Sequence, residues 1–163
     1  MDIKLIALDI DGTLTNRPDT VGERNSLAVR RAIEAGVHVT LATGRGRIAT
    51  RPIWKHLDLH GPSIQYGGAM IADIDSERAL VTHELPPEVI REVLKYSVLA
   101  GIHAQIYLDD VVIFEKTSPY AEHYVSRHRM PYAVDPDIRK KTFFNVPKVL
   151  AFAPVERQDE VLA

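Results

Sequence analysis

The sequence of 163 residues contains no cysteine, which excludes disulfide bonds and a thiolate nucleophile. It also lacks any apolar run that approaches the ~20 residues of a membrane-spanning helix. The N-terminal residues have neither the long apolar stretch nor the small-residue cleavage site of a signal peptide. Together these absences predict a cytoplasmic protein that does not insert into a membrane.

Neither sign of charge dominates the chain, because 20 lysines and arginines stand against 22 aspartates and glutamates, for a net charge of -2. No basic stripe is visible, so we expect no nucleic-acid partner. Apolar residues make up 45% of the sequence, which is ordinary for a globular protein and enough to form a core.

Signatures of zinc sites and serine hydrolases are also missing. His56 and His60 have the i, i+4 spacing of a helical metal site, but the stretch ends at Gly61 and no third ligand is suggested. Ser97 and Ser126 lack the Gly-x-Ser-x-Gly context of a nucleophilic serine. We therefore expect neither chemistry.

The first part of the chain alternates short apolar runs with helical patterns. This alternation predicts a Rossmann-like α/β core with a parallel sheet over residues 1–82. The expected elements are a buried strand at 3–9, a helix at 22–35 ended by Gly36, a strand at 37–43, a helix reaching about Leu57, and a strand, glycine turn and hairpin at 62–73.

From residue 83 the pattern changes, and hairpins and helices predict a separate α+β module over residues 83–163. The expected elements are a helix at 86–101, a hairpin turning at Asp109 and Asp110, a helix at 118–129, a strand at 146–153 and a helix from Pro154, within which the sequence ends.

Two carboxylates close the first expected strand, in the stretch KLIALDIDGTLT. Asp9 and Asp11 should gather at the C-terminal edge of the sheet, where ligands bind in open α/β folds. They would repel each other unless a hard cation such as Mg²⁺ lies between them or one is protonated. Three interpretations compete: an exposed turn, a calcium loop and phosphoryl transfer. The calcium loop fails, because Leu14 and Thr20 occupy its glycine and acidic positions.

The second expected strand ends in LATGR, which places a hydroxyl and a glycine before a helix. Thr43 and the backbone N–H of Gly44 would form a cradle for an anion. This motif alone also describes a structural turn. Its combination with Asp9 and Asp11, at the end of a neighbouring strand, favours phosphoryl chemistry.

ALDIDGTLT and LATGR resemble the first two motifs of the haloacid dehalogenase-like hydrolases. IQYGGAMI and the later α+β module resemble the Cof-type branch of this superfamily, which carries a large cap and includes sugar-phosphate phosphatases. The resemblance implies that Asp9 is the nucleophile and a Mg²⁺ ligand. Asp11 would be the general acid and base, with its backbone carbonyl on the metal. It also implies a small phosphorylated substrate.

The same resemblance implies a binding site for the transferring phosphoryl group. Thr43 would donate a hydrogen bond to it, with help from the backbone N–H groups of Gly12 and Gly44. Arg45 and Arg47 would add positive charge, although both also suit a solvated helix start.

The sequence departs from the family pattern in three places. The family also has a lysine after the cap and an acidic Gly-Asp motif, and neither is found here; Gly67 stands where many relatives have asparagine. These departures imply a chain truncated within the cap. Its sheet would expose an apolar edge and face, and it would form a homo-oligomer or associate with the missing C-terminal segment. A phosphomutase and a catalytically inactive binding or assembly module remain as alternatives.

Overall fold

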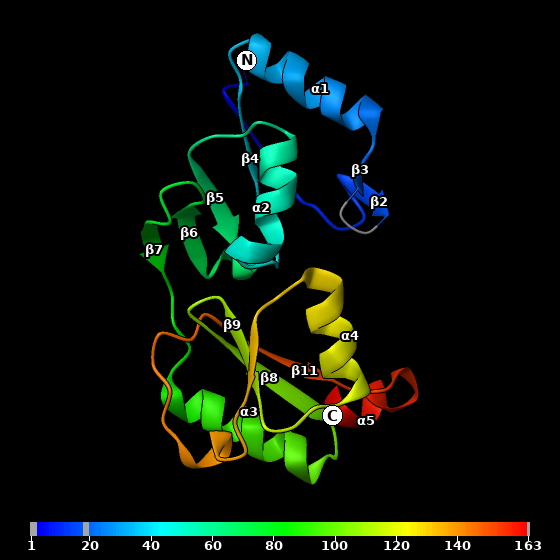
Figure 1. Ribbon diagram of the computed structural model, residues 1–163, viewed down its shortest axis with the longest axis vertical. Helices are drawn as coiled ribbons and strands as arrows, with labels where there is room; N and C mark the ends of the chain where they lie inside the picture. The colour runs from blue at the N-terminus through cyan, green and yellow to red at the C-terminus, as the bar shows by residue number, and fades with distance from the viewer. Residues whose placement is uncertain (1–2, 18–19, 163) are drawn as a thin grey trace. The chain divides into compact units, whose positions relative to one another are not determined.

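The computed structural model describes residues 3–17 and 20–162, which form two compact units divided between His83 and Glu84 (Figure 1). Sequence analysis placed this division one residue earlier. None of the helices in the described ranges is long and apolar enough to span a membrane.

The N-terminal unit is built on a sheet that begins with two parallel strands. In this pair β1 (Leu5–Leu8) lies beside β4 (His38–Leu41). A parallel bridge between Ala42 and Ile64 places β5 (Pro62–Gln65) at the far side of β4. The antiparallel strands β6 (Met70–Asp73) and β7 (Ala79–Thr82) follow β5. The predicted α/β core with a parallel sheet is confirmed.

Two helices connect the parallel strands and supply much of the core. Helix α1 (Glu23–Glu34) ends as expected, because Gly36 has a φ of 80° and occupies the left-handed C′ position. Helix α2 (Arg47–His56) buries Ile53 and Trp54 completely. These side chains share one core with Ile10 of the loop after β1, Leu41 of β4 and Ile74, which follows β6.

The prediction that the first strand is buried is wrong. Leu5 is 57% exposed, while Ile6 and Leu8 are half-buried against the core. Within the described residues β1 pairs with β4 alone, so its other edge is open. The exposed edge and face that the family resemblance implied are therefore present.

Short strands account for most of the elements that the sequence did not predict. Directly after Asp11, β2 (Thr15–Arg17) and β3 (Thr20–Val21) form a small antiparallel pair. Two further strands, β7 and β10 (Tyr132–Val134), have three or four residues each. Runs this short show no clear alternation of apolar and polar residues.

The C-terminal unit has a four-stranded sheet in the order β10-β9-β8-β11. Strands β8 (His103–Leu108) and β9 (Val111–Phe114) form the predicted hairpin, and β11 (Lys148–Phe152) pairs antiparallel with β8. Asp109 and Asp110 have φ values of 49° and 62°, as a type I′ turn requires. The expected α+β module is confirmed.

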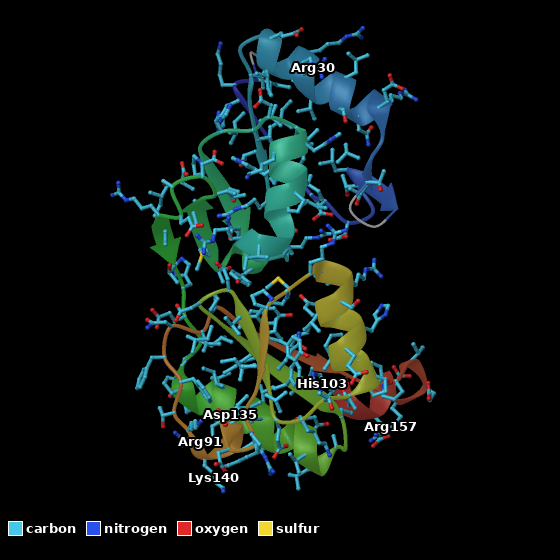
Figure 2. The ribbon with its side chains drawn as sticks, in the orientation of Figure 1. Arg30, Arg91, His103, Asp135, Lys140 and Arg157 are labelled. Atoms are coloured by element: carbon cyan, nitrogen blue, oxygen red, sulfur yellow. The ribbon has the colours of Figure 1, made fainter. Side chains whose placement is uncertain are left out.

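Helices complete this unit. They are α3 (Pro87–Leu99), α4 (Pro119–His128) and the short α5 (Gln158–Leu162), and the chain also has 3₁₀ turns at Tyr66–Gly68, Ile138–Lys140 and Val155–Arg157. Ile90 and Leu94 of α3 pack with Ile106 of β8. Gln105 and Tyr107 lie on the opposite face of β8, because side chains alternate along a strand. His103, which Figure 2 labels, stands at the start of β8 and shares that face by the same alternation.

Candidate active site

Asp9 follows β1 directly and stands at the C-terminal edge of the sheet. Its side chain is exposed, and Thr13 Oγ1 donates a hydrogen bond to Asp9 Oδ2 at 3.3 Å. The loop closes on itself, because the amides of Leu14 and Thr15 both donate to the carbonyl of Ile10. This turn leaves the Asp9 carboxylate open to a ligand arriving from solvent, as a nucleophile requires.

Thr43 lies at the same edge of the sheet, just after β4. The amide of Ala42 donates to the carbonyl of Leu8 at 2.8 Å, which sets the two strand ends side by side. Thr43 is only 4% exposed, and its Oγ1 accepts a hydrogen bond from the backbone N–H of Arg45 at 3.1 Å. The hydroxyl hydrogen can still be donated, so Thr43 suits the predicted contact to a phosphoryl oxygen.

Arg45 and Asp11 form a two-pronged ion pair across the site. Arg45 Nε donates to Asp11 Oδ2 at 2.9 Å, and Arg45 Nη2 donates to Asp11 Oδ1 at 2.7 Å. The arginine side chain is 5% exposed, whereas the Asp11 side chain is 51% exposed. The structure therefore brings these two predicted site residues together, with the carboxylate on the solvent side.

The two glycines of the predicted phosphate site differ in their surroundings. Gly12 has a φ of 78°, and its N–H already donates to the carbonyl of Thr15 at 2.9 Å. It shapes the loop, and contact with a phosphate would require that bond to open. Gly44 is exposed at the tip between Thr43 and Arg45.

Arg47, which was expected to add positive charge at the phosphoryl-binding site, pairs with Glu77 at 2.6 Å. Arg51, one turn further along α2, contacts the same carboxylate at 2.6 Å. Hydrogen bonds from Arg51 and then from Arg47 lower the pKa of Glu77 below its ordinary value. Both arginines thus tie α2 to the loop after β6.

Tyr66 is a site residue that sequence reasoning did not identify. It is 7% exposed and has a φ of 52°, which is unusual for an aromatic residue. Its N–H donates to the Arg45 carbonyl, and the next amide, that of Gly67, donates to the Thr43 carbonyl. An aromatic residue before two glycines was the available signal, and it does not specify this conformation.

The oxygen ligands of the site fit a hard cation such as Mg²⁺, but they are few. Asp9 offers a carboxylate and Asp11 a backbone carbonyl, while the Asp11 side chain is held by Arg45. No group of three or more histidine, aspartate or glutamate side chains gathers around a possible metal position in the part of the chain that the structure describes. Most ligands of a bound ion would therefore be water or groups from elsewhere.

Comparison with known proteins identifies the family of this chain. Over residues 6–163 the sequence matches the family of haloacid dehalogenase-like hydrolases. The chain belongs to this family. A haloacid dehalogenase-like hydrolase from Bacteroides thetaiotaomicron shares the fold with a TM-score of 0.83 and 25% identity, covering 98% of this chain and 62% of that one.

Two curated relatives, at 30% and 32% identity, are phosphatases by name. The pyridoxal phosphate phosphatase of Escherichia coli is 30% identical over 71% of this chain and 42% of its own length. The 5-amino-6-(5-phospho-D-ribitylamino)uracil phosphatase of Bacillus subtilis is 32% identical over 66% of this chain and 37% of its own length. The chain thus spans less than half the length of these relatives.

Proposed function

We propose that this haloacid dehalogenase-like chain carries the nucleophile and the acid–base residue of a Mg²⁺-dependent phosphatase of the Cof-type branch. Its substrate would be a small phosphorylated metabolite in the cytoplasm. One observation supports this most strongly. Asp9 and Asp11 follow β1, and Thr43 follows the parallel neighbour β4, so all three side chains belong to one edge of the sheet.

In the first half-reaction the Asp9 carboxylate attacks phosphorus, and the bond from phosphorus to the ester oxygen breaks. Asp11 donates its proton to that leaving oxygen, so an alcohol departs and an aspartyl-phosphate remains. In the second half-reaction Asp11, now a carboxylate, takes a proton from water as the water oxygen attacks phosphorus. Inorganic phosphate leaves, and the Asp9 carboxylate is restored.

Thr43 would hold the phosphoryl group during both steps by donating its hydroxyl hydrogen, with the Gly44 N–H as a second donor. Mg²⁺, held by the Asp9 carboxylate and the Asp11 carbonyl, would offset the negative charge of the phosphate. The two curated relatives act on a pyridoxal phosphate and on a phosphoribityl compound by name, which supports a phosphate monoester of a small metabolite as substrate.

The proposal is tested by hydrolysis of p-nitrophenyl phosphate with and without Mg²⁺. Asp9→Asn should lower the metal-dependent rate by about 10³-fold or more, because the nucleophile is lost. Asp58→Asn is the matched control. Asp58 is 93% exposed and has a φ of 53°, a conformation that asparagine accepts readily. Full activity in Asp9→Asn would refute the assigned nucleophile.

A second candidate is a binding or assembly module without catalysis. It is favoured by the small number of metal ligands that the described residues bring together. The same assay separates the two functions. A folded chain that releases no phosphate at any Mg²⁺ concentration, alone or with an added polypeptide that supplies the family's lysine and acidic motif, fits the module. Activity that such a polypeptide restores indicates an enzyme completed by association.

A further inference from the structure

The guanidinium of Arg45 is fixed on more than one side. Besides the two bonds to Asp11, its Nη1 donates to the carbonyl of Ala49 in the first turn of α2, at 3.2 Å. Its own backbone is bonded to the Thr43 hydroxyl and to the amide of Tyr66. Arg45 therefore joins the loop after β1, the loop after β4, the start of α2 and the end of β5.

This anchoring defines the orientation of the Asp11 carboxylate. Paired bonds from Nε and Nη2 fix both the position and the plane of a carboxylate, which a single bond does not. Because the guanidinium is buried and Asp11 is half exposed, the arginine approaches from the protein side and leaves the solvent side of Asp11 for a substrate. Little of the guanidinium is left for a substrate phosphate, because the Arg45 side chain is 5% exposed.

We propose that Arg45 is a positioning residue, which aims the Asp11 carboxyl group for proton transfer and does not bind the substrate phosphate. This inference rests on the proposed phosphatase function. Arg45 acts through Asp11, so its loss affects the steps that move a proton. Binding of the phosphoryl group belongs to Thr43 and to the loop amides.

Substrates with different leaving groups separate the two roles. Nitrophenolate leaves without a proton, whereas the alkoxide of glycerol 2-phosphate needs one. Arg45→Lys keeps the charge and loses the planar fork. In single-turnover assays of leaving-group release, which report the first half-reaction alone, it should lower the rate with glycerol 2-phosphate by about 100-fold, the scale expected for a misplaced catalytic group. The rate with p-nitrophenyl phosphate should fall far less, because its leaving group needs no proton. Inhibition by inorganic phosphate should not change.

Asp11→Asn provides the second arm of this experiment. In that background Arg45→Lys should cause no further loss on either substrate, because the group that it positions is already gone. Arg51→Lys, the same substitution at a partly exposed arginine of α2, should behave like wild type on both substrates. A higher KM for both esters and weaker inhibition by phosphate, unchanged in the Asp11→Asn background, would assign Arg45 to the phosphate and overturn the proposal.

A stability cycle gives a readout that does not depend on turnover. Melting temperatures of wild type, Arg45→Lys, Asp11→Asn and the double variant should show strong coupling, with the double variant no less stable than the worse single one. Additive losses would show that Arg45 does not hold Asp11. If wild type hydrolyses neither ester, alone or with a polypeptide that supplies the family's lysine and acidic motif, the phosphatase function fails and the catalytic role of Arg45 with it. The stability cycle still decides whether Arg45 holds Asp11.

Discussion

At the scale of single residues, Thr43 shows how one hydroxyl can serve the fold and the site together. Its oxygen accepts the Arg45 amide, which shapes the loop, and its hydrogen remains for a phosphoryl oxygen. Thr43→Val should therefore lower kcat/KM for p-nitrophenyl phosphate by about 100-fold, as the loss of one oxyanion donor does elsewhere. Thr43→Ser, which keeps the hydroxyl, should retain most of the activity.

Thr50→Val is the control for this prediction. Thr50 is fully buried, and its hydroxyl donates to the Gly46 carbonyl at 2.9 Å within α2. Its replacement removes a buried hydrogen bond without removing a phosphate donor, so stability should fall while kcat/KM stays close to wild type. Equal losses of activity in Thr43→Val and Thr50→Val would show that the Thr43 effect is merely structural.

A second prediction at the residue scale concerns Gly46, which lies against the ring of Tyr66. A Cβ atom at position 46 would come within 2.3 Å of Tyr66 Oη and 2.5 Å of Tyr66 Cζ. Tyr66 is buried and its ring is rigid, so it cannot easily move. Gly46→Ala should destabilise the protein by about 1–3 kcal/mol in urea unfolding followed by Trp54 fluorescence.

Gly22→Ala tests whether crowding is the cause. Gly22 and Gly46 both precede the first residue of a helix with extended backbone, but nothing lies within 4 Å of a Cβ at position 22. The loss in Gly46→Ala should exceed that in Gly22→Ala. The loss of stability caused by Gly46→Ala should also be smaller in a Tyr66→Gly background, where the ring is absent. Glycine accepts the positive φ of position 66. Equal effects at the two glycines would point to helix capping alone.

At the scale of elements, length decides what the sequence could predict. Helices α1, α2 and α3 and the β8-β9 hairpin have enough residues to show periodicity or a turn signal. Strands of two to four residues, such as β2 and β3, are held by tertiary pairing and leave no pattern. The burial of β1 was misjudged because an apolar run does not reveal how many strands flank it.

The candidate site was also predictable only in part. Asp9, Asp11 and Thr43 were predictable because each closes an apolar run, and parallel strands bring their ends to one edge. The Arg45–Asp11 pair was not predictable, since it joins residues 34 positions apart, in the loops after β4 and β1. Sequence spacing placed both residues near the site without revealing their contact.

Polar groups around His103 on one face of β8 predict that the stability of the protein depends on pH. Ser118 Oγ lies 3.1 Å from His103 Nδ1, His103 Nε2 lies 3.2 Å from Gln105 Oε1, and Gln105 Nε2 donates to Tyr107 Oη at 2.8 Å. Burial lowers the pKa of His103 below its ordinary value of 6.5. The folded state therefore prefers the neutral ring.

The sign follows from proton binding. As the pH falls through 6.5, the unfolded chain takes up a proton at His103 more readily than the folded chain, so stability is full above this pH and falls as the pH decreases. Denaturant unfolding, followed by the near-ultraviolet circular dichroism of the tyrosines, measures the free energy of unfolding. This free energy should fall more between pH 7.5 and pH 5 in wild type than in His103→Gln. His60→Gln, where the histidine is 79% exposed, should match wild type. Identical pH profiles in all three proteins would contradict the prediction.

At the scale of the whole molecule, the open side of β1 is the feature with the widest consequence. Leu5 is 57% exposed and Ile3 65% exposed, along a strand edge that no other strand in the described ranges covers. Beside it lies an apolar groove of about 210 Å³ between α1 and the sheet, lined by residues that include Ile6, Leu8, Leu14, Ala28, Val29 and Val39. An exposed strand edge with apolar side chains is a template for pairing with another chain.

We therefore expect the 163-residue chain to associate with copies of itself through β1, and the association to increase with concentration. Leu5→Lys should reduce it, because a charge on an edge strand opposes pairing. Light scattering combined with size-exclusion chromatography measures the mass, with Leu99→Lys as the control, since Leu99 is 86% exposed at the end of α3 in the other unit. A wild-type chain that stays monomeric at every concentration would mean that an open edge of this length does not suffice for association. If Leu5→Lys and Leu99→Lys reduce the association equally, the added charge matters and its position does not. That result would argue against a contact through β1.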